Sequence, residues 1–140
     1  MVDMFGIPQK KSLGRVLVID DEADVRKSVT MALTKSGYEV IEAEDGQKAI
    51  AMMNSGDNPL VVDVIICDIR MPKVNGIEAV AYFRAQCPSR PVLVLTGFPD
   101  IQLATSLMKQ GVVDYLVKPI EREKLATAVE NAMTHRNKVA

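Results

Sequence analysis

Five short apolar runs restrict the fold of this chain more than any other feature of its sequence. Several of them, including Val16–Ile19, Val64–Cys67 and Val92–Leu95, are apolar at every position. This pattern is typical of strands covered on both faces in a parallel sheet, because a half-exposed strand alternates apolar and polar residues. The sequence therefore predicts five parallel strands, at Arg15–Asp20, Tyr38–Ala43, Val61–Asp68, Pro91–Thr96 and Val112–Lys118.

Segments with helical spacing alternate with these runs. Each carries one apolar stripe built from residues three and four positions apart. The stripes begin at Val25, Ala49, Ile77, Ile101 and Leu125. Gly37, Gly56 and Gly111 stand where three of the helices should end, which is a usual place for glycine. Five repeats of strand and helix predict a doubly wound α/β fold with helices on both faces of the sheet.

The pattern indicates one domain. We expect residues 1–14 to be an N-terminal extension, residues 15–136 the domain and residues 137–140 a C-terminal tail. Lys and Arg number 17 against 18 Asp and Glu, so a net charge of −1 gives no overall attraction to nucleic acid or to a membrane surface. No apolar run approaches the roughly 20 residues of a membrane span. We expect a cytoplasmic protein whose two cysteines are reduced thiols.

Carboxylate, hydroxyl and ammonium side chains stand at the carboxyl ends of four of the five predicted strands. The first strand ends in Asp20 with Asp21 next to it, the third ends in Asp68, the fourth in Thr96 and the fifth in Lys118. Because ligands of open parallel sheets bind beyond the carboxyl ends of the strands, these side chains should meet at one edge. Three carboxylates at one edge repel one another. Mg²⁺ suits them, since it takes few carboxylates together with waters and a phosphoryl oxygen.

Phosphoryl transfer is the chemistry that this set of residues favours. An ionised carboxylate is a nucleophile that can form an aspartyl phosphate, so no general base is required. Such a transfer depends on positioning and on positive charge around the phosphoryl oxygens. Lys118, the Thr96 hydroxyl and a backbone N–H near Gly97 would supply these beside Mg²⁺. His135, the one histidine, lies close to the C-terminus.

Four segments together resemble the CheY-type response-regulator receiver family. They occur in the family's order and spacing between about Arg15 and Arg136, and they are Val18–Glu22, Asp68–Pro72 with Gly76, Leu95–Gly97 and Tyr115–Pro119. The resemblance implies a flavodoxin-like, five-stranded parallel sheet of order 2-1-3-4-5 with five helices, in three layers α/β/α. It also implies a phosphorylation-dependent switch in two-component signalling.

The resemblance assigns the metal site residue by residue. Asp68 is similar to the family's phosphoacceptor. Asp21, Asp68 and the backbone carbonyl of Arg70 match its direct Mg²⁺ ligands, and Asp20 matches the acidic residue that holds the ion through water. Mn²⁺ is expected to substitute for Mg²⁺.

The remaining motif residues match the phosphate contacts and the switch. Thr96, Lys118 and the backbone of Gly97 correspond to the groups that contact the phosphoryl oxygens. Tyr115 resembles the aromatic residue that turns inward when Thr96 moves toward the phosphate. The peptide bond between Lys118 and Pro119 is expected to be cis, as the family has it.

Two residues give this chain individuality within the family pattern. Arg70 lies two residues after the acceptor, and Phe98 lies two residues after Thr96. We expect both side chains to flank the phosphoryl group and to lengthen the life of the phosphorylated state by covering the approach of water. The alternative is that both face solvent or contact a partner.

The leading hypothesis is a receiver that takes a phosphoryl group onto Asp68 from a sensor histidine kinase or a phosphotransfer protein. It would then signal to a downstream effector through the face formed by the fourth predicted helix, the fifth strand and the fifth helix. We expect a monomer or a phosphorylation-promoted homodimer that binds neither nucleic acid nor membrane. It would not be an enzyme, although it would assist its own phosphorylation and dephosphorylation.

Three other functions fit less well. A phosphatase with an aspartyl nucleophile typically has an acid–base Asp two residues later, where Arg70 stands. A pseudo-receiver that only binds a partner would not need the complete set of acidic, hydroxyl and amine groups, and a phosphorylation assay distinguishes it. A flavin-binding flavodoxin would need a phosphate-cradling loop after the first strand, where Asp20–Glu22 would repel phosphate.

Overall fold

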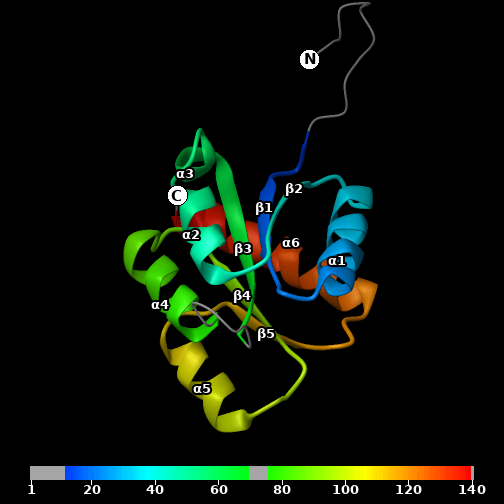
Figure 1. The fold of residues 1–140 in the computed structure, drawn as a ribbon, viewed down its shortest axis with the longest axis vertical. Helices are drawn as coiled ribbons and strands as arrows, with labels where there is room; N and C mark the ends of the chain where they lie inside the picture. The colour runs from blue at the N-terminus through cyan, green and yellow to red at the C-terminus, as the bar shows by residue number, and fades with distance from the viewer. Residues whose placement is uncertain (1–11, 70–75, 140) are drawn as a thin grey trace, which may run out of the picture.

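The computed structural model describes residues 12–69 and 76–139 of the chain. Strands and helices alternate along them (Figure 1). The strands are β1 (Arg15–Ile19), β2 (Glu39–Ala43), β3 (Val62–Asp68), β4 (Val92–Thr96) and β5 (Asp114–Val117). The helices are α1 (Ala23–Lys35), α2 (Gly46–Met53), α3 (Asn58–Val61), α4 (Gly76–Gln86), α5 (Ile101–Lys109) and α6 (Arg122–Val139). None of the described helices is long and apolar enough to cross a membrane.

The strands form one parallel sheet of order β2-β1-β3-β4-β5, as predicted. Its register brings the carboxyl ends of the strands to one edge. Ile19 pairs with Ala43 on one side and with Cys67 on the other, and Thr96 pairs with Val117. The residues that follow β1 and β5, and those that end β3 and β4, are therefore neighbours in space.

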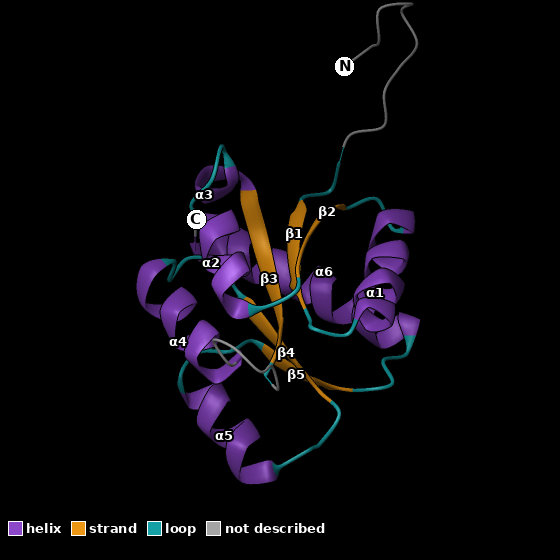
Figure 2. Cartoon of the chain, in the orientation of Figure 1, coloured by secondary structure: helices purple, strands orange, loops and turns teal. Residues whose placement is uncertain are grey.

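Helices cover both faces of the sheet (Figure 2). Along β1, Val16 and Val18 pack with the apolar residues of α1 and α6, whereas Leu17 and Ile19 pack with those of α2, α4 and α5. All four are fully buried. Each such side chain contributes about 1.5–3 kcal/mol by leaving water, and this two-sided burial is why the strand sequences are continuously apolar.

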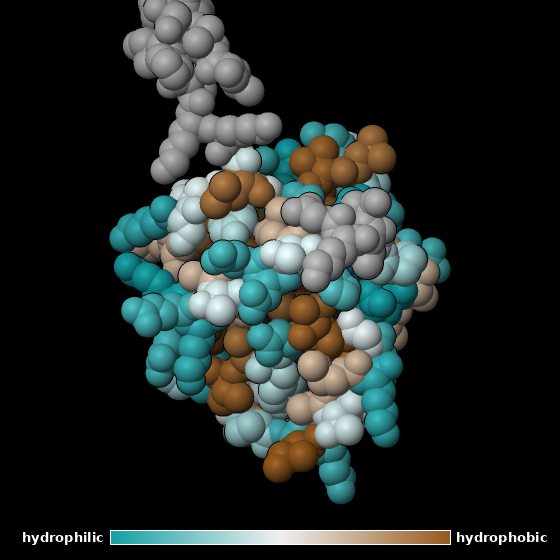
Figure 3. Space-filling model, turned by 180° about the vertical axis from the view of Figure 1, so that it is seen from behind, coloured by the Kyte–Doolittle hydropathy of each residue, from teal (hydrophilic) through white to brown (hydrophobic). Residues whose placement is uncertain are grey.

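The surface is mixed in polarity. Seen from behind, apolar residues form separate patches among hydrophilic ones (Figure 3). Exposed large apolar residues of the described chain include Leu60 on α3 and Ile101 at the start of α5, which are 82% and 86% exposed.

The prediction of five helices was wrong by one, because the described residues form six. The additional helix, α3, is a single turn with Pro59 in its first turn, and the Leu60 and Val61 N–H groups donate to the Asp57 carbonyl. It takes up Val61, which the sequence assigned to the third strand. Four residues are too few for a 3.6-residue apolar period to show, so the pattern could not indicate this turn. Other strand boundaries moved by one or two residues.

Candidate functional site

Four carboxylates gather at the carboxyl edge of the sheet. Asp20 directly follows β1, Asp68 ends the adjacent strand β3, and Asp21 and Glu22 lie in the loop that leads into α1. One carboxylate oxygen of each lies within 4.8 Å of those of the other three. Asp20 is fully buried and Asp68 is 2% exposed, whereas Asp21 and Glu22 are exposed.

Lys118 brings the positive charge to this cluster. It follows β5, and its Nζ lies 2.9 Å from Asp20 Oδ2, 3.1 Å from Asp68 Oδ2 and 3.1 Å from Glu22 Oε1. Burial alone would lower the pKa of this ammonium group, but Asp20 and then Asp68 outweigh burial and raise that pKa. Lys118 is therefore firmly charged at neutral pH. The peptide bond to Pro119 that follows it is cis.

The donor set fits Mg²⁺ better than softer metals, because all four of these side chains offer carboxylate oxygens. Asp20 Oδ2 accepts no hydrogen bond of normal geometry from the described residues, so its close contact with Lys118 is a poorly directed ion pair. A buried carboxylate oxygen in this state has capacity for a further polar partner such as a metal-bound water. Arg70, whose backbone carbonyl was expected to be a Mg²⁺ ligand, lies outside the described residues.

The Thr96 hydroxyl is engaged with the loop that follows β4. It accepts a hydrogen bond from the Phe98 N–H (3.0 Å) and lies 3.3 Å from the Phe98 carbonyl oxygen, to which it donates. Thr96 is fully buried, Gly97 is exposed, and Phe98 is 65% exposed. The expected phosphate contacts thus lie at the same edge as Asp68, with the hydroxyl bound to its own loop in this structure.

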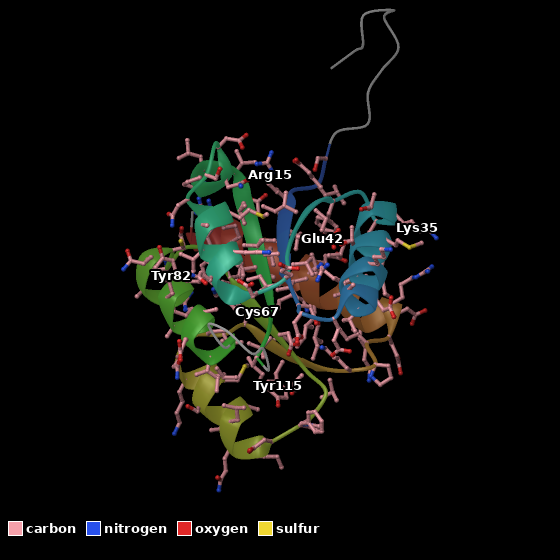
Figure 4. The ribbon with its side chains drawn as sticks, in the orientation of Figure 1. Arg15, Lys35, Glu42, Cys67, Tyr82 and Tyr115 are labelled. Atoms are coloured by element: carbon pink, nitrogen blue, oxygen red, sulfur yellow. The ribbon has the colours of Figure 1, made fainter. Side chains whose placement is uncertain are left out.

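Tyr115 connects β5 to the same loop. Its side chain is partly buried against the core on the α2, α4 and α5 face, and its hydroxyl accepts a hydrogen bond from the Asp100 N–H at 3.3 Å. The Asp100 side chain in turn caps α5 by accepting from the Leu103 N–H. Figure 4 labels Tyr115 on its strand near the start of α5. Thr96 and Tyr115 therefore contact one loop at two points two residues apart.

Several contacts of the site were not predicted. Glu22 was part of the acidic motif without a role of its own, yet it contacts Lys118. Gly76 begins α4 against the backbone of the acceptor strand, and a Cβ there would overlap the Asp68 carbonyl. The sequence signal for this glycine was its place in the motif that begins at Asp68. At the opposite end of the sheet, the Asp63 side chain accepts a hydrogen bond from the Arg15 N–H.

Cys67 lies directly before the acceptor and is fully buried. Its Sγ lies 3.3 Å from the Asp68 carbonyl oxygen. Burial raises the pKa of this thiol strongly, and the negative charges of Asp68 and Asp20 add to the effect. The thiol is therefore uncharged at neutral pH and acts as a small core side chain.

A family model described as the response regulator receiver domain matches residues 16–130 of the chain. The transcriptional regulatory protein FixJ of Bradyrhizobium diazoefficiens is 35% identical over 120 residues, which are 86% of this chain and 57% of that protein. The DNA-binding transcriptional regulator NtrC of Proteus hauseri is 32% identical over 122 residues, which are 87% of this chain and 25% of that protein. The chain spans less than two thirds of the length of either relative.

Solved structures match the fold over most of the chain. A response regulator receiver domain protein from Clostridium thermocellum superposes with a TM-score of 0.84 at 30% identity, covering 91% of this chain and 100% of that one. The chemotaxis protein CheY4 of Vibrio cholerae superposes with a TM-score of 0.78 at 32% identity, covering 86% of this chain and 99% of that one.

Proposed function

Since this chain belongs to the response regulator receiver family, we propose that Asp68 accepts a phosphoryl group from a phosphohistidine of a sensor kinase or a phosphotransfer protein. Receiver domains are signalling domains rather than classical enzymes, and they bind Mg²⁺ at an acidic pocket. The observation that carries the proposal is that Asp20, which follows β1, and Asp68, which ends β3, both lie within about 3 Å of the Lys118 ammonium group, which follows β5.

In the proposed transfer, an Asp68 carboxylate oxygen attacks the phosphorus atom. The new O–P bond forms as the P–N bond to the donor imidazole breaks, and the electron pair of that bond goes to the imidazole nitrogen. Asp68 enters the reaction as an anion, so the chain needs no proton acceptor for this step. Lys118 Nζ, 3.1 Å from Asp68 Oδ2, is close enough to shift to a phosphoryl oxygen and balance its charge.

Asp21 and Asp68 would hold Mg²⁺ directly, and Asp20 would hold it through water. When bound, the ion supplies charge neutralisation for the acidic cluster and for the phosphoryl oxygens. Because Asp68 is almost fully buried, a donor would have to be positioned closely for its phosphorus atom to reach this carboxylate.

The switch would start at Thr96. A phosphoryl group on Asp68 offers the Thr96 hydroxyl a charged acceptor in place of the Phe98 carbonyl, and the loop to Asp100 would follow. Tyr115, bound to the Asp100 N–H, would respond to that movement. The predicted fourth and fifth helices correspond to α5 and α6, so the proposed output face is α5-β5-α6, with a population shift between two states as its mechanism.

Phe98 is part of the proposal for the lifetime of the phosphorylated state. Phe98 is 65% exposed here, so its side chain would have to turn toward Asp68 to cover the approach of water. Arg70 would act with it. The alternative is that the exposed ring of Phe98 belongs to the surface that meets a partner.

The output and the partners of a longer protein are proposals as well. The names of the two relatives describe transcriptional regulators, and this chain spans only part of their length. We infer that the chain transmits its state to an effector by contact and does not itself bind nucleic acid, in keeping with its net charge of −1.

Incubation with acetyl phosphate and Mg²⁺, followed by intact-mass measurement, tests the acceptor. One phosphoryl group should be added to the wild type, none to Asp68→Asn, and one to the matched control Asp63→Asn, which changes an aspartate at the other end of the same strand. Chelation by EDTA should prevent labelling. Full labelling of Asp68→Asn would overturn the assignment, and a wild type that is never labelled would favour the pseudo-receiver.

A further inference from the structure

Arg26 on α1 connects two elements at the acidic edge of the sheet. Its Nη1 donates to the backbone carbonyl of Asp20 at 2.8 Å, and its Nε donates to Glu42 Oε1 on β2 at 3.1 Å. The side chains of Arg26 and Glu42 are 19% and 37% exposed, so the pair is partly shielded from water. Figure 4 labels Glu42 between β2 and α1.

These contacts hold the loop that carries the acidic motif from both sides. The Asp20 N–H donates to the Ala43 carbonyl of β2 at 3.1 Å, while the Asp20 carbonyl accepts from Arg26. The Asp20 side chain then closes a turn by accepting from the Glu22 N–H at 2.8 Å. The peptide unit between Asp20 and Asp21 is thus tied to β2 through Glu42 and to α1 through Arg26.

We propose that Arg26 and Glu42 are positioning residues that set the orientation of the Asp20–Asp21 carboxylates for the divalent cation. This inference rests on the proposed function. A guanidinium group suits the task because its planar fork fixes two acceptors at once, which a flexible ammonium cannot do. Residues that orient ligands in this way typically change metal affinity by about 10–100-fold when they are removed.

The positive charge of Arg26 weakens Mg²⁺ binding, whereas its positioning of the loop strengthens it. The test must separate these two effects. Removing Arg26 alone takes a cation away from a cation site, which would strengthen Mg²⁺ binding. Arg26→Met/Glu42→Gln removes one charge of each sign, so the net charge is unchanged and the loss of positioning dominates. Methionine also lacks any donor that could replace the contact with the Asp20 carbonyl.

A matched control lies at the opposite end of β2, where Glu39 pairs with an arginine. Arg15 forms an ion pair with Glu39 at 3.0 Å and also contacts Asp57 and Asn58. Arg15→Met/Glu39→Gln therefore has the same charge balance and removes at least as many contacts. It should lower stability without reaching the acidic edge.

The experiment titrates Mg²⁺ into each variant of the 140-residue chain by calorimetry and measures amide exchange without metal. Arg26→Met/Glu42→Gln should bind Mg²⁺ about tenfold more weakly than the wild type. Its labelling by acetyl phosphate should recover at saturating Mg²⁺. Its Glu22 amide should exchange faster even in EDTA, because the turn at Asp20 loosens. The Arg15 and Glu39 control should match the wild type in all three measurements.

A Mg²⁺ affinity within about twofold of the wild type in Arg26→Met/Glu42→Gln, or a control weakened equally, would overturn the inference. If the double variant does not fold, Arg26→Lys replaces it, since it keeps the charge and loses the fork; unchanged affinity there would also overturn the inference. Absence of Mg²⁺ binding by the wild type would instead contradict the proposed function. The metal-free exchange of the Glu22 amide would still decide whether Arg26 positions the loop.

Discussion

Replacing Lys118 by methionine should cost the metal-free protein about 3 kcal/mol of unfolding free energy. The ammonium Nζ lies 2.9 Å from Asp20 Oδ2 and 3.1 Å from Asp68 Oδ2. At an effective dielectric constant of about 20, each contact represents about 5–6 kcal/mol of gross attraction. Desolvation of the three groups cancels much of this, and removing one partner of a buried ion pair typically costs about 3–5 kcal/mol. We expect the lower end of this range of free energies, because the Lys118 side chain is 13% exposed and water reaches it.

Urea unfolding followed by circular dichroism measures this loss, since the chain has no tryptophan to report by fluorescence. With an m-value of about 2 kcal/mol/M, the urea midpoint should fall by roughly 1.5 M. Excess Mg²⁺ should reduce the difference in unfolding free energy between the wild type and Lys118→Met. The ion stabilises the folded state by binding to it, and in the variant no Lys118 ammonium group competes for the carboxylates. Lys48→Met is the matched control, since Lys48 pairs with Glu44 on the exposed surface and should change stability by less than about 0.5 kcal/mol.

Two results would refute this reasoning. One is a metal-free Lys118→Met variant as stable as the wild type within about 0.5 kcal/mol. The other is a loss of unfolding free energy in Lys118→Met that has the same size with and without Mg²⁺. Adding Asp68→Asn to Lys118→Met should recover part of the loss, because it removes one of the two unpaired carboxylates, and strict additivity would argue against their coupling.

Four further predictions follow from the same contacts. Because the folded-state pKa of Lys118 is raised, its contribution to stability should be complete below the unfolded value of 10.5 and be lost as pH rises through the folded value; a stability difference between wild type and Lys118→Met that grows above pH 10.5 would contradict this. Gly76→Ala should lower stability by about 1–3 kcal/mol and slow acetyl phosphate labelling, because a Cβ overlaps the Asp68 carbonyl; an unchanged Tm would be the contrary result. Iodoacetamide should modify the half-buried Cys87 before the fully buried Cys67, which mass spectrometry can follow, and equal rates would contradict the burial argument. Beryllofluoride with Mg²⁺ should change amide exchange in α5 and β5, whereas a response confined to α1 would exclude the Thr96 and Tyr115 route.

The sequence alone determined the sheet and the placement of its chemistry. Continuous apolar runs require cover on both faces, and a parallel sheet aligns the carboxyl ends of its strands, so the convergence of Asp20, Asp68 and Lys118 followed from pattern and topology together. The roles of these residues came from the family resemblance. The domain limits at residues 15 and 136 stay predictions, and so does every role assigned to Arg70.

Only the tertiary structure decided which side chains meet across elements. Arg26 and Glu42 are 16 residues apart, and they meet because α1 packs on β1 and β2 with one particular rotation about its axis. The contact of Glu22 with Lys118 spans 96 residues and depends on the path of the loop after β1. Apolar periodicity specifies which face of a helix is buried, but it does not specify how the polar residues beside that face are aligned with their neighbours. Those alignments depend on helix rotation and loop geometry, which are settled only when the whole core packs.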